Sequence, residues 1–413
     1  MDMSAEVLFY IIIAVFIIGF VFNKILEFLN ASWFKKPVPE ILNDIYDSEK
    51  YTKQQNYLFD NHRFGIFTSS FNFIVILGFL FLGGFAYVDK VVSEITNHYI
   101  LSSLLFFGII FLLSDIISTP FDIYDTFVIE EKYGFNKTTP KIYVFDKLKA
   151  WIITSIIGGG LLSLIIWIYN LDPVNFWLYA WGVIIFFNVF FLMFYSVLIV
   201  PLFNKQTPLE EGALKQAIIE LGKKAGFNID KIFIIDGSKR STKANAYFTG
   251  FGPKKRIVLY DTLVNQMNTD EILAVISHEI GHYKHKDIYK SLFVSILETG
   301  VMLYVFGLLA NSEILSQSLG VSEPKFHIAL ITFGILYSPF STVLGIISSY
   351  FSRKAEFNAD NFAANLGYSI SLISALKKLS SNNLSNLTHH PVVVKFTYSH
   401  PPLYDRVLNL LNR

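Results

Sequence analysis

The chain has 413 residues, of which 53% are hydrophobic and only 16% are charged, and its formal net charge is +1. Soluble globular proteins carry about 25% charged residues, so lipid is the expected environment for much of this surface. The near-neutral charge gives no indication of a nucleic-acid partner. The absence of cysteine excludes thiolate zinc sites, disulfides and cysteine nucleophiles, so any metal site must use His, Asp or Glu.

Seven apolar stretches of about 20 residues are long enough to cross a bilayer. They lie at 6–28, 64–88, 98–119, 150–170, 176–202, 288–310 and 327–350. The first stretch lacks the basic n-region and the small-residue cleavage site of a signal peptide, so we predict a retained helix. The sequence therefore predicts a mainly α-helical, multi-pass membrane protein with seven transmembrane helices.

Basic residues alternate between the two sides of these predicted spans. The loops 29–63 and 120–149, the segment 203–287 and the C-terminal tail are rich in Lys and Arg, whereas the three opposite loops carry only Lys90 and Lys325. Lys and Arg accumulate in cytoplasmic loops. We therefore predict that the N-terminus faces outward and that the large polar parts and the C-terminus are cytoplasmic.

The segment 203–287 is the one substantial insertion outside the membrane, and its pattern predicts an α+β domain. The expected elements are an amphipathic helix from Pro208 to Gly226, a strand at 231–235, and a hairpin of 246–251 and 256–260 joined by a turn at 252–255. Asp270 is predicted to cap a further helix that begins at Glu271.

That further helix carries the strongest motif of the chain, His278-Glu279-Ile280-Gly281-His282, an HExxH pattern. Residues four apart share one face of a helix, so both imidazoles can bind one ion, and Glu279 lies where it can hold a water on that ion. A catalytic zinc takes three protein ligands and keeps a position for water. The motif predicts a zinc hydrolase with Glu279 as general base.

The third zinc ligand has several candidates. His285 lies on the same stripe, but a rigid helix rarely surrounds a tetrahedral ion over three consecutive turns, and the metzincin pattern fails because residue 288 is Ile. We favour Glu356, directly after the seventh predicted span, with Asp360 four residues later orienting a ligand imidazole. His278 precedes the sixth span and Glu356 follows the seventh, so an antiparallel helix pair returns both to the cytoplasmic side.

These expectations divide the chain into four parts. They are 1–202 with five spans and their cytoplasmic loops, 203–287 with the cytoplasmic metalloprotease domain and the HExxH helix, 288–350 with the last two spans, and 351–413, which completes the zinc site. The predicted fold class is a helical membrane protein with a zincin-like α+β domain on its cytoplasmic side, of the gluzincin type.

Several further pieces of the chain carry a family resemblance. They are 126–130 with 134–137, 245–248, 256–263, the HExxH run, 356–360, 382–384 and 398–402. Over nearly its full length the chain resembles the type I CAAX prenyl proteases, which are integral-membrane zinc metalloproteases. The resemblance implies seven helices that form a barrel around a water-filled chamber capped by the zinc domain. It also implies removal of the C-terminal tripeptide from prenylated Cys-a-a-X substrates.

The resemblance also implies roles for residues outside the HExxH motif. The substrate would be aligned by Asn245, Ala246, Tyr247 and Phe248. His400 would stand near the zinc, and Arg406 would brace the ligand carboxylates. As a hypothesis of our own, His400 is the donor that stabilises the oxyanion together with the zinc. One departure is Asp287, because typical members of the family have His at this place, and Asp resembles the related heat-shock membrane zinc proteases.

The predicted function is therefore that of a zinc-dependent membrane endopeptidase with one Zn²⁺ per chain, in which Glu279 assists the attack of a zinc-bound water. Its expected partners are peptide or prenylated-peptide substrates and membrane lipids, with no nucleic acid; nothing in the sequence indicates an oligomeric state. A second enzyme hypothesis is a membrane-protein quality-control protease with broader, non-prenylated substrates. Abundant Ile, Asn and Lys are compatible with a bacterial member of the family, located in the inner membrane; a eukaryotic member would lie in the endoplasmic reticulum.

Two non-enzymatic functions are also compatible with the sequence: a zinc-containing transporter, and a structural protein whose zinc only holds the cytoplasmic domain together. Charged residues within or beside the spans, namely Asp115, Asp122, Asp125 and Glu298, are expected to face a wet cavity or a partner. Such residues suit a chamber and a transporter equally, but a transporter more often shows internal repeats, and this sequence has none that we detect.

Overall fold

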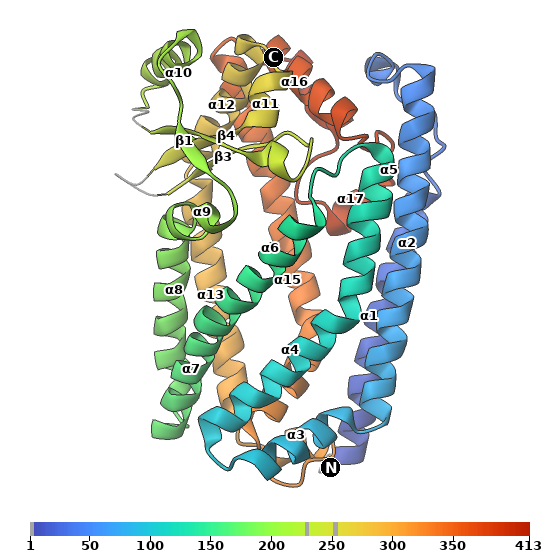
Figure 1. Cartoon of the computed structure of the whole chain (residues 1–413), viewed down its shortest axis with the longest axis vertical. Helices are drawn as coiled ribbons and strands as arrows, with labels where there is room; N and C mark the ends of the chain where they lie inside the picture. The colour runs from blue at the N-terminus through green and yellow to red at the C-terminus, as the bar shows by residue number, and fades with distance from the viewer. Residues whose placement is uncertain (1–3, 228–230, 251–254) are drawn as a thin grey trace.

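The computed structural model describes residues 4–227, 231–250 and 255–413, and these contain seven helices long and apolar enough to cross a membrane (Figure 1). They are Ala5–Ala31 (α1), Ser48–Phe81 (α2), Tyr99–Tyr133 (α4, η2 and α5), Pro140–Leu171 (α6, η3 and α7), Phe176–Phe203 (α8 and α9), Asp287–Leu309 (α13) and Phe326–Asn365 (α15). The prediction of a mainly helical protein with seven membrane helices is confirmed.

Several of the helices extend beyond the predicted spans: the second begins at Ser48, the third continues to Tyr133 and the fourth begins at Pro140. The second helix stops at Phe81 because Gly83 adopts a left-handed conformation (φ 68°), which a residue without Cβ tolerates, and Gly84–Ile95 forms a separate helix, α3. The seventh helix continues for 40 residues to Asn365. The residues after the seventh predicted span, including Glu356, therefore lie on the same helix as the span itself.

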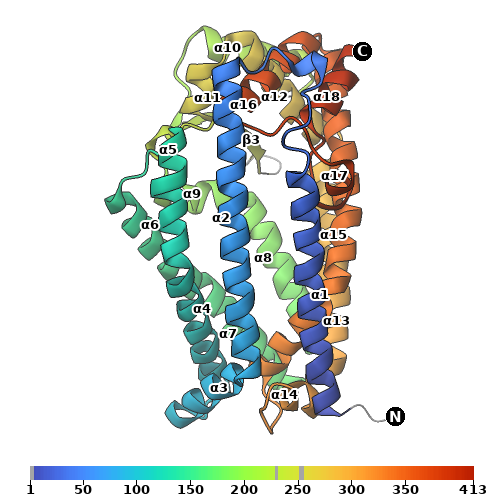
Figure 2. The same cartoon turned by 90° about the vertical axis from the view of Figure 1, so that its right-hand side faces the viewer.

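The spans form a closed ring. Along the chain, α1 packs against α2, α2 against η2 (Asp125–Glu130), α4 (Tyr99–Tyr124) against α7 (Gly159–Leu171), and α7 against α8 (Phe176–Leu198). The ring continues from α8 to α13 and from α13 to α15, and it closes where α15 packs against α1 (Figures 1 and 2). The helices therefore form the barrel that the resemblance implied.

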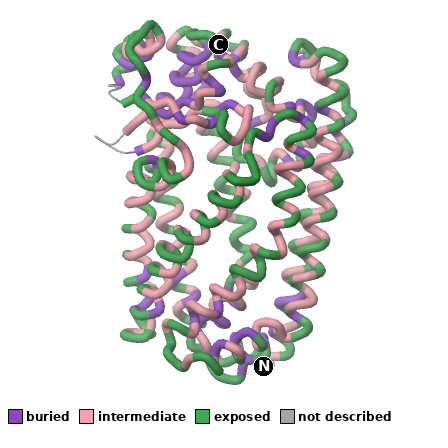
Figure 3. Tube along the Cα trace, viewed as in Figure 1, coloured by how far each residue is buried: buried purple, intermediate pink, exposed green. Residues whose placement is uncertain are grey.

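Buried residues gather at the two ends of this barrel (Figure 3). At the end that carries the N-terminus, one apolar cluster joins all seven spans, and its most buried large side chains are Ile12, Phe106, Ile166, Phe176 and Ile328, each at most 1% exposed. Between the two ends, only 6–17% of the residues in the most apolar windows of the spans are buried. Apolar side chains that stay exposed along a span are expected where lipid is the solvent.

Two of the charged residues expected to face a wet cavity or a partner, Asp115 and Asp122, lie near the same ammonium. Asp115 of α4 lies 3.1 Å from the Lys147 ammonium of α6 (Pro140–Ile153), and Asp122 lies 4.0 Å from the same nitrogen. The Lys147 ammonium also donates to Thr119 Oγ1 at 2.5 Å. A paired charge is tolerated at this depth far better than an isolated one, which agrees with the expectation for Asp115 and Asp122.

The other end of the barrel carries a four-stranded mixed sheet with the order β1-β2-β4-β3. The strands are Gln206–Pro208 (β1), Ile232–Ile235 (β2), Ala246–Thr249 (β3) and Arg256–Tyr260 (β4). Strands β2 and β4 are parallel, and β3 pairs antiparallel with β4, so that Ala246 lies opposite Leu259. No strand of the described residues pairs with the outer edge of β3.

The predicted strand and hairpin of this domain correspond to β2 and to β3 with β4, and the turn predicted at 252–255 falls largely on 251–254, outside the described residues. The amphipathic helix is α10, Ala213–Lys224, and the predicted start at Pro208 is wrong. Pro208 instead ends β1, and the Leu209 N–H donates to the Ile232 carbonyl at 2.9 Å, which extends the pairing with β2.

Most of the remaining helices lie at the same end of the barrel as the HExxH helix, which is α12 (Thr269–Lys284). They are η1 (Glu40–Leu42), η4 (Gly237–Lys239), α11 (Asp261–Gln266), α16 (Ser369–Asn382), α17 (Pro391–Thr397) and α18 (Leu403–Leu411). Helix α14 (Glu313–Gln317) lies at the opposite end, where it packs against α15 and α1 (Figure 2). Helix α12 contacts α15 and α16, and α18 contacts both α15 and α16. The C-terminal residues therefore surround the metal motif from the side opposite the sheet.

Candidate metal centre

The helix that carries HExxH begins with a capping box. The Asn268 side chain accepts the Glu271 N–H at 2.9 Å, and the Glu271 carboxylate accepts the Asn268 N–H at 2.9 Å, which satisfies two donors that a helix start leaves free. Helix α12 therefore starts at Thr269, and the predicted cap at Asp270 is wrong. The same Glu271 carboxylate accepts from Ser374 and Lys378 of α16, which fixes the helix start against the C-terminal part.

Glycine in the middle of the motif lets α15 approach α12 closely. A Cβ atom on Gly281 would lie 2.9 Å from Cα and 3.1 Å from the carbonyl oxygen of Ala359. Both atoms are backbone and cannot move aside as a side-chain tip can. This contact sets the distance between the two helices that carry the HExxH residues and Glu356.

We expect Gly281→Ala to lower both metal content and activity. The added methyl group pushes α15 away from α12, and overpacking of this kind typically destabilises a core by about 1–3 kcal/mol. Elemental analysis of the purified variant and its melting temperature measure the two effects. Gly345→Ala on α15 is the matched control, because a Cβ there meets nothing within 4 Å; equal metal content in both variants would contradict the role of this contact.

The structure brings His278, His282 and Glu356 together. The two Nε2 atoms are 3.1 Å apart, and Glu356 places Oε2 3.5 Å from His278 Nε2 and Oε1 3.3 Å from His282 Nε2. Their ligand atoms all lie within 4.8 Å of one another. Among the described residues, these three side chains form the group of His, Asp or Glu whose ligand atoms lie close enough to hold one metal ion. His285 is outside it: its ring packs edge-on against Phe362, with centroids 6.3 Å apart.

Both histidines are oriented by a carboxylate on their other ring nitrogen. His278 Nδ1 lies 2.9 Å from Asp360 Oδ1, and His282 Nδ1 lies 3.1 Å from Asp287 Oδ2. An Nδ1–H donated to a carboxylate leaves the Nε2 lone pair free for a metal and holds the ring in place. Asp360 was expected to do this from its position in the sequence, whereas Asp287 was noted only as a departure from the family pattern.

These donors fit a divalent cation. Two Nε2 lone pairs and a carboxylate converge on one point, and Glu356 Oε2 is a buried oxygen without a hydrogen-bond partner in the described part of the chain. Ligand atoms bound tetrahedrally to zinc lie about 3.3 Å from one another, and the three separations here are 3.1, 3.3 and 3.5 Å. With no sulfur donor, a His₂Glu set matches the ligands of hydrolytic zinc sites.

The charge of the site also favours a cation. Burial by itself lowers the pKa of His278, but hydrogen bonds with Asp360 and Glu356 outweigh burial and raise this pKa to about 9. The protein thus stabilises positive charge between the imidazoles, and a metal ion supplies that charge when it displaces the proton.

Arg406 of α18 ties the two carboxylates of α15 together. It binds Asp360 bidentately, with Nε 2.9 Å from Oδ2 and Nη2 2.6 Å from Oδ1, and its Nη1 lies 3.3 Å from Glu356 Oε2. The side chain is only 11% exposed. A buried bidentate arginine fixes both position and orientation of a carboxylate, and Arg406 contacts the two carboxylates that the resemblance expected it to brace.

Glu279 lies one residue beyond His278 and is largely enclosed. Burial raises the pKa of Glu279 above the ordinary value of a glutamate, while the charges of both histidines and a hydrogen bond from the Phe248 backbone N–H act in the opposite direction. A carboxylate whose pKa is raised toward neutrality is a more effective general base. The contact with Phe248 also places β3 directly beside Glu279.

Among the other residues implied by the resemblance, His400 contacts the ligand Glu356, whereas Asn245 and Tyr247 contact other parts of the chain. His400 is 66% exposed, and its Nε2 lies 3.2 Å from Glu356 Oε1, while Ser399 Oγ lies 2.9 Å from its Nδ1. Asn245 is exposed just before β3, and its carbonyl accepts the Tyr260 N–H at 3.0 Å. Within β3, Tyr247 places its hydroxyl 3.4 Å from Ser196 Oγ of α8.

Strand β3 packs on α12 through aromatic rings. The ring of Phe248 lies 5.3 Å from that of Tyr283, the residue after His282. This ring contact and the hydrogen bond from the Phe248 N–H to Glu279 place β3 alongside the HExxH helix.

Comparison with known proteins agrees with this geometry. Residues 27–205 match the family described as CAAX prenyl protease N-terminal, five membrane helices, and residues 208–413 match peptidase family M48. CAAX prenyl protease 1 of Saccharomyces cerevisiae is 35% identical over 90% of this chain and 88% of its own length. The CAAX prenyl protease 1 homolog of Homo sapiens is 32% identical over 90% of this chain and 88% of its own length.

A solved structure shares the whole fold. The crystal structure of S. mikatae Ste24p superposes with a TM-score of 0.93 at 34% sequence identity, covering 98% of this chain and 99% of that chain. These relatives are eukaryotic, and the bacterial origin suggested by composition stays a prediction. The transporter and structural-protein hypotheses are wrong, because the match extends over both the membrane half and the peptidase half. The chain belongs to the CAAX prenyl protease 1 family within peptidase family M48 and is an integral-membrane metalloprotease.

Proposed function

We propose that this protein removes the C-terminal tripeptide from prenylated Cys-a-a-X substrates, using one zinc ion held by His278, His282 and Glu356. The observation that carries the proposal is the convergence of these three side chains beside Glu279, at the free edge of a strand that can hold a peptide. The substrate class is supported by the names of the relatives, which are CAAX prenyl proteases over nearly their full lengths.

When bound at this site, zinc supplies a Lewis acid for the scissile carbonyl and brings the pKa of water down to about 7. Glu279 takes the proton of the attacking water and later gives it to the leaving amine, a role for which its raised pKa suits it. His400, whose Nε2 faces the ligand Glu356, donates a hydrogen bond to the developing oxyanion. Asp360, Asp287 and Arg406 act indirectly, because they hold the ligands in position.

The substrate binds as an additional strand. The outer edge of β3 offers backbone donors and acceptors, and an extended peptide that pairs with them gains affinity from its main chain and specificity from alternate side chains. Asn245 marks the start of this edge, and the half-buried strand from Ala246 to Phe248 follows it toward Glu279. Pairing along β3 therefore aligns the scissile bond with the metal.

The orientation in the membrane follows from charge. The loops at the end of the barrel with the metal centre are rich in Lys and Arg, so we place this end and the C-terminus in the cytoplasm and the N-terminus outside. In a eukaryotic cell this arrangement suits the endoplasmic reticulum. The interior of the helical ring is then a water-filled chamber below the zinc domain, and the outer surface of the ring contacts membrane lipids.

A cleavage assay tests the proposal directly. The purified, zinc-loaded protein is expected to release the tripeptide from a farnesylated Cys-a-a-X peptide at least about tenfold faster than from the same peptide without the lipid, since a buried chain adds about 0.8 kcal/mol per CH₂. Chelation should abolish release, and added zinc should restore it. Mass spectrometry identifies the released tripeptide.

The control peptide separates the two enzyme hypotheses. Equal cleavage of both peptides would support the quality-control protease with broader substrates and reject the requirement for prenylation. Failure to cleave either peptide, with zinc bound, would overturn the CAAX assignment itself.

A further inference from the structure

The segment 240–243, which leads directly into the substrate strand β3, is bound by the membrane half of the protein. Thr242 N–H donates to the Phe135 carbonyl at 3.1 Å, and Lys137 N–H donates to the Arg240 carbonyl at 3.0 Å. Asn136 and Ser241 form an antiparallel bridge between these contacts. The loop after the third span thus pairs with this segment as a short ribbon.

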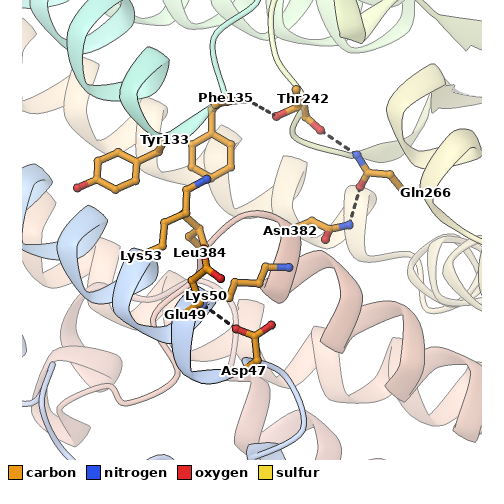
Figure 4. Close-up of a pocket in the computed structure, with 11 residues that line it drawn as sticks. Asp47, Glu49, Lys50, Lys53, Tyr133, Phe135, Thr242, Gln266, Asn382 and Leu384 are labelled. Carbon is orange, nitrogen blue, oxygen red and sulfur yellow. Dashed lines mark hydrogen bonds between the residues drawn. The ribbon is translucent and has the colours of Figure 1, made fainter.

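Side chains of the peptidase half hold the other backbone groups of the same segment (Figure 4). Gln266 of α11 donates to the Thr242 carbonyl at 3.0 Å and accepts from Asn382 at 2.9 Å. Thr262 donates to the Lys243 carbonyl at 3.1 Å. Thr242, Gln266 and Asn382 border a cavity of about 520 Å³ that Phe135 and Leu384 also line. The segment 240–243 is therefore bound by both halves of the chain. A displacement of either half also displaces this segment.

Two charged contacts anchor the segment to the membrane half. Lys243 Nζ lies 2.7 Å from Glu130 Oε2 and 3.1 Å from the Tyr57 hydroxyl, which itself donates to Glu130 Oε1 at 2.6 Å. The same ammonium lies 4.6 Å from the ring centroid of Phe135. At the start of the segment, Arg240 binds Asp146 with two hydrogen bonds of 2.7 and 3.0 Å.

Glu130 reaches this position through an irregular turn. It is the last residue of a π-helical stretch, Asp125–Glu130, in which the widened turn shifts later side chains around the helix axis. Such turns are rare and often occur at functional sites. Here the turn brings the Glu130 carboxylate, at the end of the third span, to the Lys243 ammonium. Lys243 lies three residues before Ala246, the first residue of β3.

Lys243 is so close to β3 along the chain that its ion pair with Glu130 affects the position of the strand. Three residues of extended chain span at most about 10 Å, so a shift at Lys243 is transmitted to Ala246 with little slack. The outer edge of β3 has no partner strand among the described residues, and the strand is held by β4 on its other edge and by packing on α12 and α8. A strand held on one side needs an anchor at its end to keep its register.

We infer that Glu130 and Lys243 are positioning residues, through which the membrane half sets the register of β3 against the substrate. The inference rests on the proposed function, because it takes β3 as the strand that the substrate pairs with. Neither residue touches the metal ligands, so their effect is on alignment of the peptide and not on metal binding.

The test uses Glu130→Gln and Lys243→Met in the full-length, zinc-loaded protein with the farnesylated peptide. Each variant is expected to lower kcat/KM roughly tenfold to a hundredfold, the scale of a misplaced reactant, with zinc content unchanged. The double variant should be no worse than either single one, because both remove the same contact. Exchange of the charges, Glu130→Lys with Lys243→Glu, should recover activity to within about threefold of wild type.

Backbone N-methylation of the substrate distinguishes a positioning role of Glu130 from a merely structural one. In wild type, methylation at those residues that pair with β3 should weaken cleavage; in Glu130→Gln the same methylation should have less effect, because pairing is already impaired. Lys132→Met is the matched control: Lys132 lies two residues from Glu130 but binds Asp60 of α2 at 2.6 Å, and it should leave every rate unchanged.

The outcomes separate this inference from the proposed function. If wild type does not cleave the peptide, the function fails. If wild type cleaves and Glu130→Gln matches it, or if the variants lose zinc, or if N-methylation weakens cleavage equally in wild type and variant, the positioning role is wrong.

Discussion

Glu279→Gln is expected to reduce hydrolysis roughly a hundredfold to ten-thousandfold, the usual contribution of a general base, while zinc stays bound. Glutamine keeps the size and shape of the side chain, but its amide cannot accept a proton from water. The metal ligands His278 and His282 keep their carboxylate partners, so their geometry is undisturbed. Single-turnover cleavage of the farnesylated peptide measures the loss, and elemental analysis measures the zinc.

Two controls make this result interpretable. The melting temperature of Glu279→Gln should not fall, because burial opposes the charged form of this carboxylate and the neutral amide avoids that penalty. Its affinity for a non-cleavable substrate analogue should also be kept, since the strand edge is intact. Turnover at the wild-type rate in a zinc-loaded Glu279→Gln protein would end the claim that this residue is the base.

Glu356→Ala is expected to remove most of the metal. The carboxylate is the only anionic member of the ligand group, and loss of even an outer partner of a ligand typically weakens metal binding about 10–100-fold. Removal of a ligand itself should exceed that range. Zinc per chain after dialysis against a weak chelator is the measurement, and peptide cleavage should fall in parallel with it.

A graded series gives this second prediction its controls. Asp360→Asn should weaken zinc binding less than Glu356→Ala does, because Asp360 contacts the metal only through His278 and the amide oxygen still accepts from Nδ1. His285→Ala should keep full zinc, since its ring packs against Phe362. Zinc retained in Glu356→Ala but lost in His285→Ala would instead make His285 the third ligand.

Sequence alone was sufficient for features that depend on neighbouring residues. The seven spans follow from continuous apolar runs, and the shared face of His278 and His282 follows from the periodicity of a helix. Glu356 could be proposed because two antiparallel spans must return the chain to the side from which it started. Each of these inferences uses only spacing along the chain and the thickness of a membrane.

Exact element ends were not predicted correctly from the sequence. Asp270 was predicted as the cap of the HExxH helix, whereas the reciprocal hydrogen bonds with Glu271 make Asn268 the cap. The break after α2 depends on the left-handed backbone of Gly83 in a stretch that is apolar on both sides. Hydropathy does not respond to such a turn, so the predicted span continued through it.

Tertiary structure decided the contacts that hold the ligands and the substrate strand. Asp287 meets His282 because Lys286 adopts a left-handed conformation (φ 57°) that ends α12 and starts α13, and no periodicity predicts that turn. Lys243 meets Glu130 across 113 positions of sequence. The order of amino acids determined the HExxH motif and the membrane spans, because both follow from short-range patterns. The positions of the ligands and of the substrate strand were decided by packing between distant segments. Only the folded chain brings the charged side chains of these segments into contact.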